Sequence, residues 1–282
     1  MNEKKASFAG SWYPESSREC EKEIKKFIKH KSKVLKGNFK GSIVPHAGWY
    51  FSGSIASRTI AAMQSEKIDT VIIFGIHMRP DSKPCIMIGD AWNTPFGNLK
   101  INKDFAHFIA EKENLKKETC FSFPIENTIE LQLPFIKFFF PEVSIVPIGV
   151  PPASIAVNIG ESTVKVAKKF GINIILIGST DLTHYGPDFG FIPKGLGEKA
   201  YNWVKQENDK KAVNAILEMN PLKIIEQSFE NHNLCCSGAV AATVAGAKKM
   251  NAVKGIKLDY GSSYEKKSEN SFVGYTGILF GT

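Results

Sequence analysis

Cysteine is scarce in this sequence, and its distribution argues against a fold held together by disulfides. The 282 residues include five cysteines, an odd and scattered set without a CxxC pair. Such a set argues against a framework of disulfide bonds and suits a reducing compartment. We therefore expect a cytoplasmic protein whose cysteines are thiols.

Long hydrophobic runs are also missing. No apolar stretch approaches the roughly 20 residues that a membrane-spanning helix requires. The first ten residues, MNEKKASFAG, carry charges without an apolar stretch behind them, so we expect no secretory signal. The sequence therefore predicts no membrane among the partners of this protein.

Arginine is rare although the chain is basic, with a formal net charge of +8. The lysines are spread along the chain and are densest in residues 25–41, where apolar residues at helical spacing interrupt them. This pattern is typical of a solvated helix face and a linker. Bidentate contacts to bases favour arginine, so we expect no specific nucleic-acid partner.

The common catalytic motifs are absent too. The sequence has no P-loop, no HExxH and no GxSxG motif. The segment GLGEKA at 195–200 mimics a dinucleotide-binding loop, but it follows no convincing strand and lacks the full spacing. The function therefore depends on residues that belong to none of these motifs.

The chain does contain a regular alternation of apolar, mostly β-branched runs with helical patterns. The runs lie at 42–45, 70–74, 85–88, 143–148 and 173–178, and the helical patterns at 14–31, 54–63, 104–114, 126–139, 153–170, 195–206, 209–219 and 236–249. Residues 255–280 resemble two strands joined by a polar loop near 261–270. Nearly all-apolar strands between helices predict a single α/β domain over 1–282, with a mostly parallel central sheet covered by helices on both faces.

Histidines follow two of the predicted strands directly. His46 comes just after the run at 42–45, His77 just after the run at 70–74, and Asp181 and His184 follow the run at 173–178. A single histidine after a strand is commonly a loop or capping residue. Ligand sites in open α/β sheets lie beyond the carboxyl ends of the strands, so three such segments at one edge favour a functional site. Imidazole nitrogens suit zinc, copper and iron.

Cys235 and Cys236 are adjacent to each other just before the Ala-rich helical pattern. A thiolate at the beginning of a helix is stabilised by the positive end of the helix dipole, so one of the two is a candidate metal ligand. For Cys235 we expect simple packing as a small buried residue. His30 and His107 are expected on helix surfaces or in packing, and the role of His232 is left open.

Seven segments of the chain resemble the Memo family, in the family's order and over nearly the whole length. They are AGSWYP (9–14), VPHAGWYFSG (44–53), WNTPFGNL (92–99), ENTIELQLPF (126–135), STDLTHYG (179–186), HNLCCSG (232–238) and VGYTGILF (273–280). The resemblance implies a fold similar to the class III extradiol ring-cleaving dioxygenases, which use non-haem iron. It also implies a radical-SAM protein as a partner, since prokaryotic members are often encoded beside one. The eukaryotic member is described as a binder of phosphorylated receptor peptides and as a copper- or iron-binding redox protein.

The resemblance also assigns site residues. It implies His46, His77 and Cys236 as metal ligands, and Asp181 and His184 as pocket residues. The chain departs from the family at Asn127, where the family usually has histidine after the glutamate. The cysteine stands where the dioxygenases have a carboxylate, and a thiolate favours copper(I), zinc or iron over magnesium or calcium.

Two classes of function follow from this pattern. The first is a metal-dependent oxidoreductase, with iron or copper and also zinc as candidate metals, that acts on a small aromatic or planar substrate. In it His184 would transfer a proton, and Asp181 would fix the tautomer of His184 or orient a bound water. The alternative is a non-catalytic module that holds a peptide or partner, with Trp49, Tyr50 and Trp92 as aromatic contacts, and a metal-handling role lies between the two.

Overall fold

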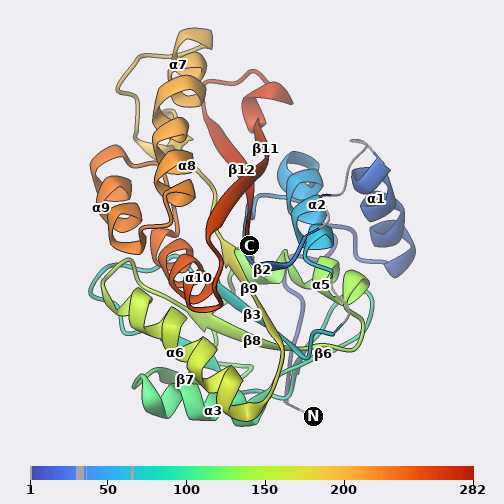
Figure 1. Ribbon diagram of the computed structural model, residues 1–282. Coiled ribbons are helices and arrows are strands. Elements are labelled where there is room, and N and C mark those ends of the chain that lie inside the picture. Colours follow the sequence, from blue (N-terminus) through green and yellow to red (C-terminus); the bar gives the residue numbers. More distant parts are fainter. Residues whose placement is uncertain (1, 30–34, 36, 65–66) are drawn as a thin grey trace.

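The computed structural model describes residues 2–29, 35, 37–64 and 67–282, which form a curled mixed sheet between two layers of helices (Figure 1). Within the described residues the main sheet follows the order β10-β12-β2-β9-β3-β8-β4-β7, and β11 pairs with β12. Its strands are β2 (Phe39–Val44), β3 (Thr70–Gly75), β4 (Cys85–Met87), β7 (Lys116–Glu118), β8 (Ser144–Gly149), β9 (Ile174–Ser179), β10 (His184–Tyr185), β11 (Lys254–Ser262) and β12 (Phe272–Gly281).

The centre of this sheet is parallel, as the sequence predicts. The pairs β2–β9, β9–β3 and β3–β8 are all parallel, whereas β12 pairs antiparallel with β2, and β4 pairs antiparallel with β8. Every residue of β3 and β9 is buried, because helices cover both faces of these strands. The predicted α/β class is confirmed, and the predicted parallel arrangement is found at the centre of a mixed sheet.

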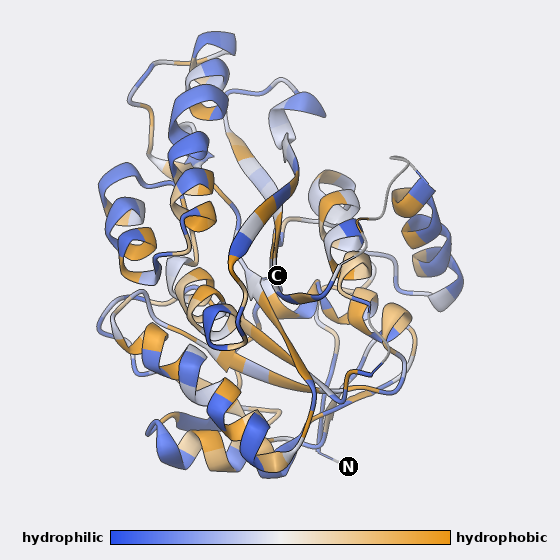
Figure 2. Cartoon of the chain, in the orientation of Figure 1, coloured by the Kyte–Doolittle hydropathy of each residue, from blue (hydrophilic) through white to orange (hydrophobic). Residues whose placement is uncertain are grey.

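Helices cover the sheet on both sides. The right-hand side of Figure 1 holds α1 (Ser17–Lys29), α2 (Ser54–Ala62) and α5 (Leu133–Phe139). The left-hand side and the top hold α3 (Lys103–Lys112), α6 (Ile155–Phe170), α7 (Glu198–Trp203), α8 (Asp209–Leu217), α9 (Pro221–Asn231) and α10 (Ser237–Lys249). Figure 2 shows the central strands as hydrophobic, whereas the outer helices alternate between hydrophobic and hydrophilic residues as amphipathic helices do.

The close packing of α6 on α10 depends on glycine. A side chain at Gly160 would place its Cβ 2.1 Å from the carbonyl oxygen of Ala242, so only glycine allows the two helices to approach this closely. Helix α10 in turn packs on β9, β2 and β3. The beginning of α10 is thereby fixed at the edge of the sheet where the parallel strands end.

Some elements differ from the predictions. The helix predicted over 126–139 is two helices, α4 (Asn127–Glu130) and α5, and Pro134 lies in the first turn of α5, where proline is tolerated. Helix α9 was not predicted; it begins with Pro221 after Asn220, whose side chain accepts a hydrogen bond from the Lys223 amide. A small second sheet of β1 (Glu3–Lys4), β5 (Ala91–Trp92) and β6 (Leu99–Lys100) was also missed.

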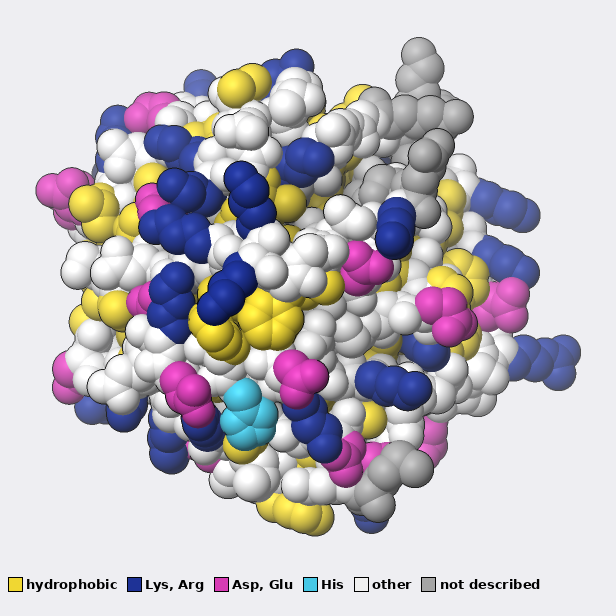
Figure 3. Space-filling view, turned by 60° about the horizontal axis from the view of Figure 1, so that its bottom comes forward, with side chains coloured by type: hydrophobic (Ala, Val, Ile, Leu, Met, Phe, Trp, Pro, Cys, Tyr) yellow, Lys and Arg dark blue, Asp and Glu magenta, His cyan; other side chains and the backbone are white. Residues whose placement is uncertain are grey.

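Apart from the buried Lys4, the described lysines are at least partly solvated, and acidic side chains lie among them. On α1, Lys25 pairs with Glu21 and Lys26 with Glu23, as a solvated helix face would. Figure 3 shows another face, where acidic side chains are interspersed among the lysines and arginines. His107 is exposed on α3 as expected, whereas His30 lies outside the described residues. None of the helices in the described ranges is long and apolar enough to span a membrane.

Candidate metal centre

The parallel strands bring the predicted site residues to one edge of the sheet. Strand β9 lies between β2 and β3, with Val44 of β2 opposite Ser179 of β9. His46 follows β2 and His77 follows β3 by two residues each, and their ring centroids are 5.1 Å apart at an angle of 86°. The prediction that these strand ends meet is therefore confirmed.

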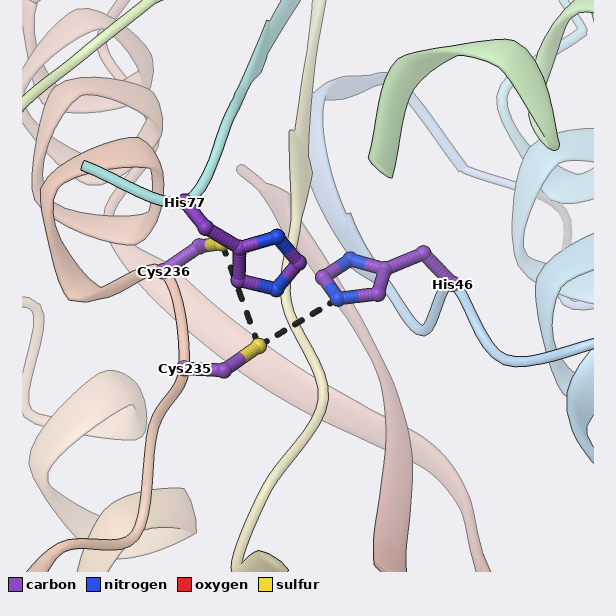
Figure 4. Close-up of side chains that lie close together, drawn as sticks. All are labelled: His46, His77, Cys235 and Cys236. Carbon is purple, nitrogen blue, oxygen red and sulfur yellow. Dashed lines mark hydrogen bonds between the residues drawn. The ribbon is translucent and has the colours of Figure 1, made fainter. Parts of the chain in front are cut away.

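Four side chains converge at this edge, as Figure 4 shows. Each of His46, His77, Cys235 and Cys236 offers one nitrogen or sulfur atom, and these four atoms all lie within 4.8 Å of one another. The two histidines come from neighbouring strand ends, and the two cysteines come from the segment that leads into α10. Two imidazoles and two sulfurs form a donor set that suits zinc, copper or iron.

The protonation of His46 follows from its hydrogen bonds. The hydroxyl of Ser179 donates its single hydrogen to the Thr128 carbonyl at 2.6 Å, so it must accept from Nδ1 of His46 at 3.0 Å. Nδ1 of His46 therefore carries a proton. The other nitrogen, Nε2, lies 3.3 Å from the sulfur of Cys235. The surroundings thus leave Nε2 of His46 directed into the cluster.

His77 is oriented by a carboxylate. Oε2 of Glu126 accepts from the backbone N–H of His77 at 3.1 Å and lies 3.3 Å from Nδ1 of the same residue. Oε1 of Glu126 caps α4 by accepting from the Thr128 amide at 3.0 Å, so the carboxylate is fixed. An ionised carboxylate only accepts hydrogen bonds, so Nδ1 of His77 is the protonated nitrogen and Nε2 is left for a metal.

Charges in the cluster shift several pKa values. Burial alone would lower the pKa of His46, but Asp181 and Cys235 outweigh it and raise that pKa. Burial opposes protonation of His77 as well, yet hydrogen bonds to Cys235 and Glu126 raise its pKa to about 10. The metal-free site therefore favours protonated imidazoles.

The two cysteines are shifted in opposite directions. Burial would raise the pKa of Cys235, but its hydrogen bond with Cys236 and the adjacent His46 lower it well below the usual range. Burial and the neighbouring Cys235 raise the pKa of Cys236. Of the two sulfurs, Cys235 is therefore the one whose surroundings favour the thiolate.

Cys235 is the main correction to the sequence analysis, which expected this residue only to pack. Its sulfur accepts a hydrogen bond from the Asp181 amide at 3.1 Å and lies 3.5 Å from the hydroxyl of Thr180. Cys236 immediately precedes α10 without a side-chain capping hydrogen bond, and its amide donates to the same hydroxyl at 3.1 Å. Both sulfurs belong to the cluster. Loop residues just before a helix have no periodicity, so the sequence pattern did not reveal the direction of the Cys235 side chain.

Asp181 contacts His46 rather than fixing the tautomer of His184. Its Oδ1 accepts from the His46 amide at 2.8 Å, and its Oδ2 lies 3.9 Å from Nε2 of His46. Nδ1 of His184 lies 3.3 Å from the Leu182 carbonyl oxygen. The ring of His184 packs edge-on against the ring of Phe189, with the ring centroids 4.9 Å apart. Burial raises the pKa of Asp181, although the positive charge of His46 opposes this effect.

A cavity of about 580 Å³ opens above the cluster. His46, His77, Asn127, Asp181 and His184 all line it, as do the aromatic residues Trp12, Tyr50, Phe51 and Phe189. Asn127, at the position where the family usually has histidine, donates from its amide to the His46 carbonyl at 3.0 Å. It thus supports the backbone beneath the ring of His46.

Two of the three predicted aromatic contacts are absent from this cavity. Trp49 is buried and stacks on Phe135 with ring centroids 4.1 Å apart, and Trp92 is buried against Phe123. Only Tyr50 lines the cavity as predicted. The sequence analysis missed Trp12, Ser179 and Glu126, although each belongs to one of the quoted motifs.

Known proteins resemble this chain over nearly its whole length. A MEMO1 family protein of Methanococcoides burtonii is 29% identical over 275 residues, covering 96% of this chain and 97% of the relative. A MEMO1 family protein of Pyrococcus horikoshii is 30% identical over 282 residues, with the same coverage. The solved structure of an uncharacterized protein from Escherichia coli K12 superimposes with a TM-score of 0.48 at 8% identity, over 86% of this chain and 100% of that one. The model of the Memo-like protein family matches residues 4–279, and the chain therefore belongs to this family.

Proposed function

We propose that this protein binds a transition metal through Nε2 of His46, Nε2 of His77 and the thiolate of Cys236. One observation carries this proposal: Ser179 and Glu126 occupy the Nδ1 atoms of the two histidines, and both Nε2 atoms are left for the cluster. Partners of this kind fix the tautomer and the orientation of metal-binding histidines.

Iron and copper are the metals that this proposal favours, and zinc also fits the donor set. A thiolate is a soft ligand and imidazole suits all three metals, so magnesium and calcium are disfavoured. When bound, the metal supplies Lewis-acid or electron-transfer chemistry at the floor of the cavity. The residues around it determine which molecule enters and where its protons go.

The cavity fits a small planar substrate. Its volume of about 580 Å³ falls within the range of roughly 300–1,000 Å³ that is common for small-molecule sites. Trp12, Tyr50 and Phe189 offer aromatic faces, and His184 and Asp181 offer groups that exchange protons. We therefore propose a metal-dependent oxidoreductase, with His184 transferring a proton to or from the bound molecule.

The alternative of a peptide-binding module has less support in this structure. It relied on Trp49, Tyr50 and Trp92, of which only Tyr50 reaches the cavity. Association with a radical-SAM partner stays a prediction from the family resemblance.

Metal analysis of ligand variants tests the proposed site. Protein purified without chelators and reconstituted anaerobically with iron(II), copper(I) or zinc(II) should hold one metal ion per chain. His77→Ala should lose that metal, and so should His46→Ala. His77 is half-exposed, so its variant should fold even if removal of the buried His46 ring disturbs the fold. His107→Ala, at an exposed position on α3, is the matched control and should retain the metal.

His184→Ala separates the role of this residue from that of the ligands. His184 lines the cavity, but its ring nitrogen faces the Leu182 carbonyl and it is not one of the four clustered donors. The variant should therefore keep its metal and lose affinity for aromatic molecules in the cavity, or lose turnover. Loss of the metal from His184→Ala to the same extent as from His46→Ala would refute this division of roles.

A further inference from the structure

Cys235 is placed as a metal ligand would be, although it is outside the three-residue ligand set proposed above. Its sulfur lies 3.3 Å from Nε2 of His46 and 3.8 Å from the sulfur of Cys236. All four donor atoms, including that of His77, lie within 4.8 Å of one another. A residue that only packed in the interior would have no reason to direct its sulfur at the metal-binding nitrogen of His46.

Two of the donor–donor distances are close to the edges of a tetrahedron around one metal ion. In a tetrahedral site, metal–sulfur bonds of about 2.3 Å and metal–nitrogen bonds of about 2.0 Å place two sulfurs about 3.8 Å apart, and a sulfur and a nitrogen about 3.5 Å apart. The observed sulfur–sulfur separation is 3.8 Å, and the sulfur–nitrogen separation is slightly shorter at 3.3 Å. One ion can therefore contact both sulfurs without a rearrangement of the backbone.

A backbone N–H is directed at the sulfur of Cys235. The amide of Asp181 donates to this sulfur at 3.1 Å, whereas the hydroxyl of Thr180, 3.5 Å away, donates its hydrogen to the Asp181 carbonyl at 2.9 Å. The backbone of the same loop is fixed by the Cys235 amide, which donates to the Asp181 carbonyl at 3.3 Å. Donors directed at a sulfur stabilise it as an anion, which is the form that binds metal.

We infer that Cys235 is a second sulfur ligand and that this chain builds a four-donor centre from His46, His77, Cys235 and Cys236. This inference rests on the proposed metal site and specifies its metal. Two thiolates and two imidazoles in a tetrahedral arrangement favour copper(I) or zinc(II) over iron(II). A molecule in the cavity then reaches the metal only when one ligand moves away.

Cobalt(II) substitution counts the thiolate ligands directly. Each thiolate–cobalt bond contributes charge-transfer absorption in the near ultraviolet. The cobalt-loaded protein should therefore absorb about twice as strongly there as Cys235→Ser or Cys236→Ser. Cys120→Ser, a buried cysteine outside the cluster, is the matched control and should leave the intensity unchanged. Full intensity in Cys235→Ser would overturn the inference while leaving the proposed metal site intact.

Alkylation of the unaltered protein tests the inference without relying on a variant that folds. Cys235 is half-buried and lines a second cavity beside Met78 and His184, whereas the other four cysteines are buried. Iodoacetamide should modify Cys235 in the metal-free protein and at least tenfold more slowly after loading with cobalt(II). Equal modification in both states, with cobalt bound, would refute the ligand role of Cys235. Failure of the unaltered protein to bind cobalt at all would instead refute the proposed function.

Discussion

Ser179 is the residue that determines which nitrogen of His46 is available. Its hydroxyl donates to Thr128 and accepts from Nδ1 of His46, so the metal-binding nitrogen is selected by a single buried side chain. Removing such a supporting partner lowers metal affinity by about 10- to 100-fold in comparable sites. Ser179→Ala should show a loss of this size in a competition titration with a chromophoric chelator.

The matched control for Ser179→Ala is Ser57→Ala. Ser57 is equally buried on α2 but has no role in the cluster. Unchanged affinity in Ser179→Ala would show that the ring of His46 does not need this partner. Similar losses in both variants would show a general effect on the fold.

The pH dependence of metal binding follows from the raised pKa of His77. The neighbours of His77 hold its pKa at about 10, so the metal-free ring is protonated at neutral pH. A metal must displace that proton, and affinity therefore falls as pH falls through this pKa. We expect the affinity for metal to keep rising between pH 7 and 9. The affinity of a site built from histidines with ordinary pKa values would become constant above about pH 6.5.

Calorimetry in two buffers of different ionisation enthalpy measures this effect as protons released on zinc binding. The buried thiol of Cys236, whose pKa is also raised, should add to the release. An affinity that is constant above pH 7, with no proton release, would contradict the charge arrangement described for the metal-free site.

The position of the two cysteines depends on how α10 packs against α6. It begins after Cys236, and it packs on α6 where Gly160 meets Ala242. Gly160→Ala would place a Cβ 2.1 Å from the Ala242 carbonyl oxygen, so the helices must separate. Overpacking of this kind costs about 1–3 kcal/mol of unfolding free energy.

Gly160→Ala should therefore lower the midpoint of urea denaturation and also weaken zinc binding, because α10 positions Cys236. Glu161→Ala, one residue along α6 at a partly exposed position, is the control and should change neither. Reduced stability with unaltered zinc affinity would show that the cysteines are positioned independently of α10.

Elements with a clear hydrophobic period were predictable from the sequence, and those without one were not. The five buried runs became β2, β3, β4, β8 and β9, because strands covered on both faces are almost continuously apolar. The strands β5, β6 and β10 have two residues each, too few to show any period. Helix α9 was missed although Asn220 and Pro221 are typical of a helix start.

The same reasoning explains which residues of the site could be predicted. The order of strands predicts which loops meet at one edge of a sheet, and so His46 and His77 were identified. The directions of side chains in loops do not follow from such a pattern. Trp49 lies in a π-helical turn (Trp49–Gly53) and points into the core, and Cys235 points into the cluster, both against expectation.

At the scale of the whole molecule, an open cavity lies at the edge of the sheet where the parallel strands end. Parallel strands fix the two histidines, α10 fixes the cysteines, and aromatic residues from distant segments, such as Trp12 and Phe189, complete the walls. Sites whose ligands are held by regular elements keep their geometry better than sites built on loops alone. We therefore expect the fold to persist without metal, and circular dichroism should show the same secondary structure before and after chelation.

The most direct test of the central claim is a crystal structure of the zinc- or copper-loaded protein with anomalous scattering recorded at the metal edge. One strong peak is expected among the four donors. It should lie about 2.0–2.1 Å from Nε2 of His46 and of His77 and about 2.3 Å from the sulfur of Cys236. A peak bound to Nδ1 of either histidine, or located away from this cluster, would contradict it.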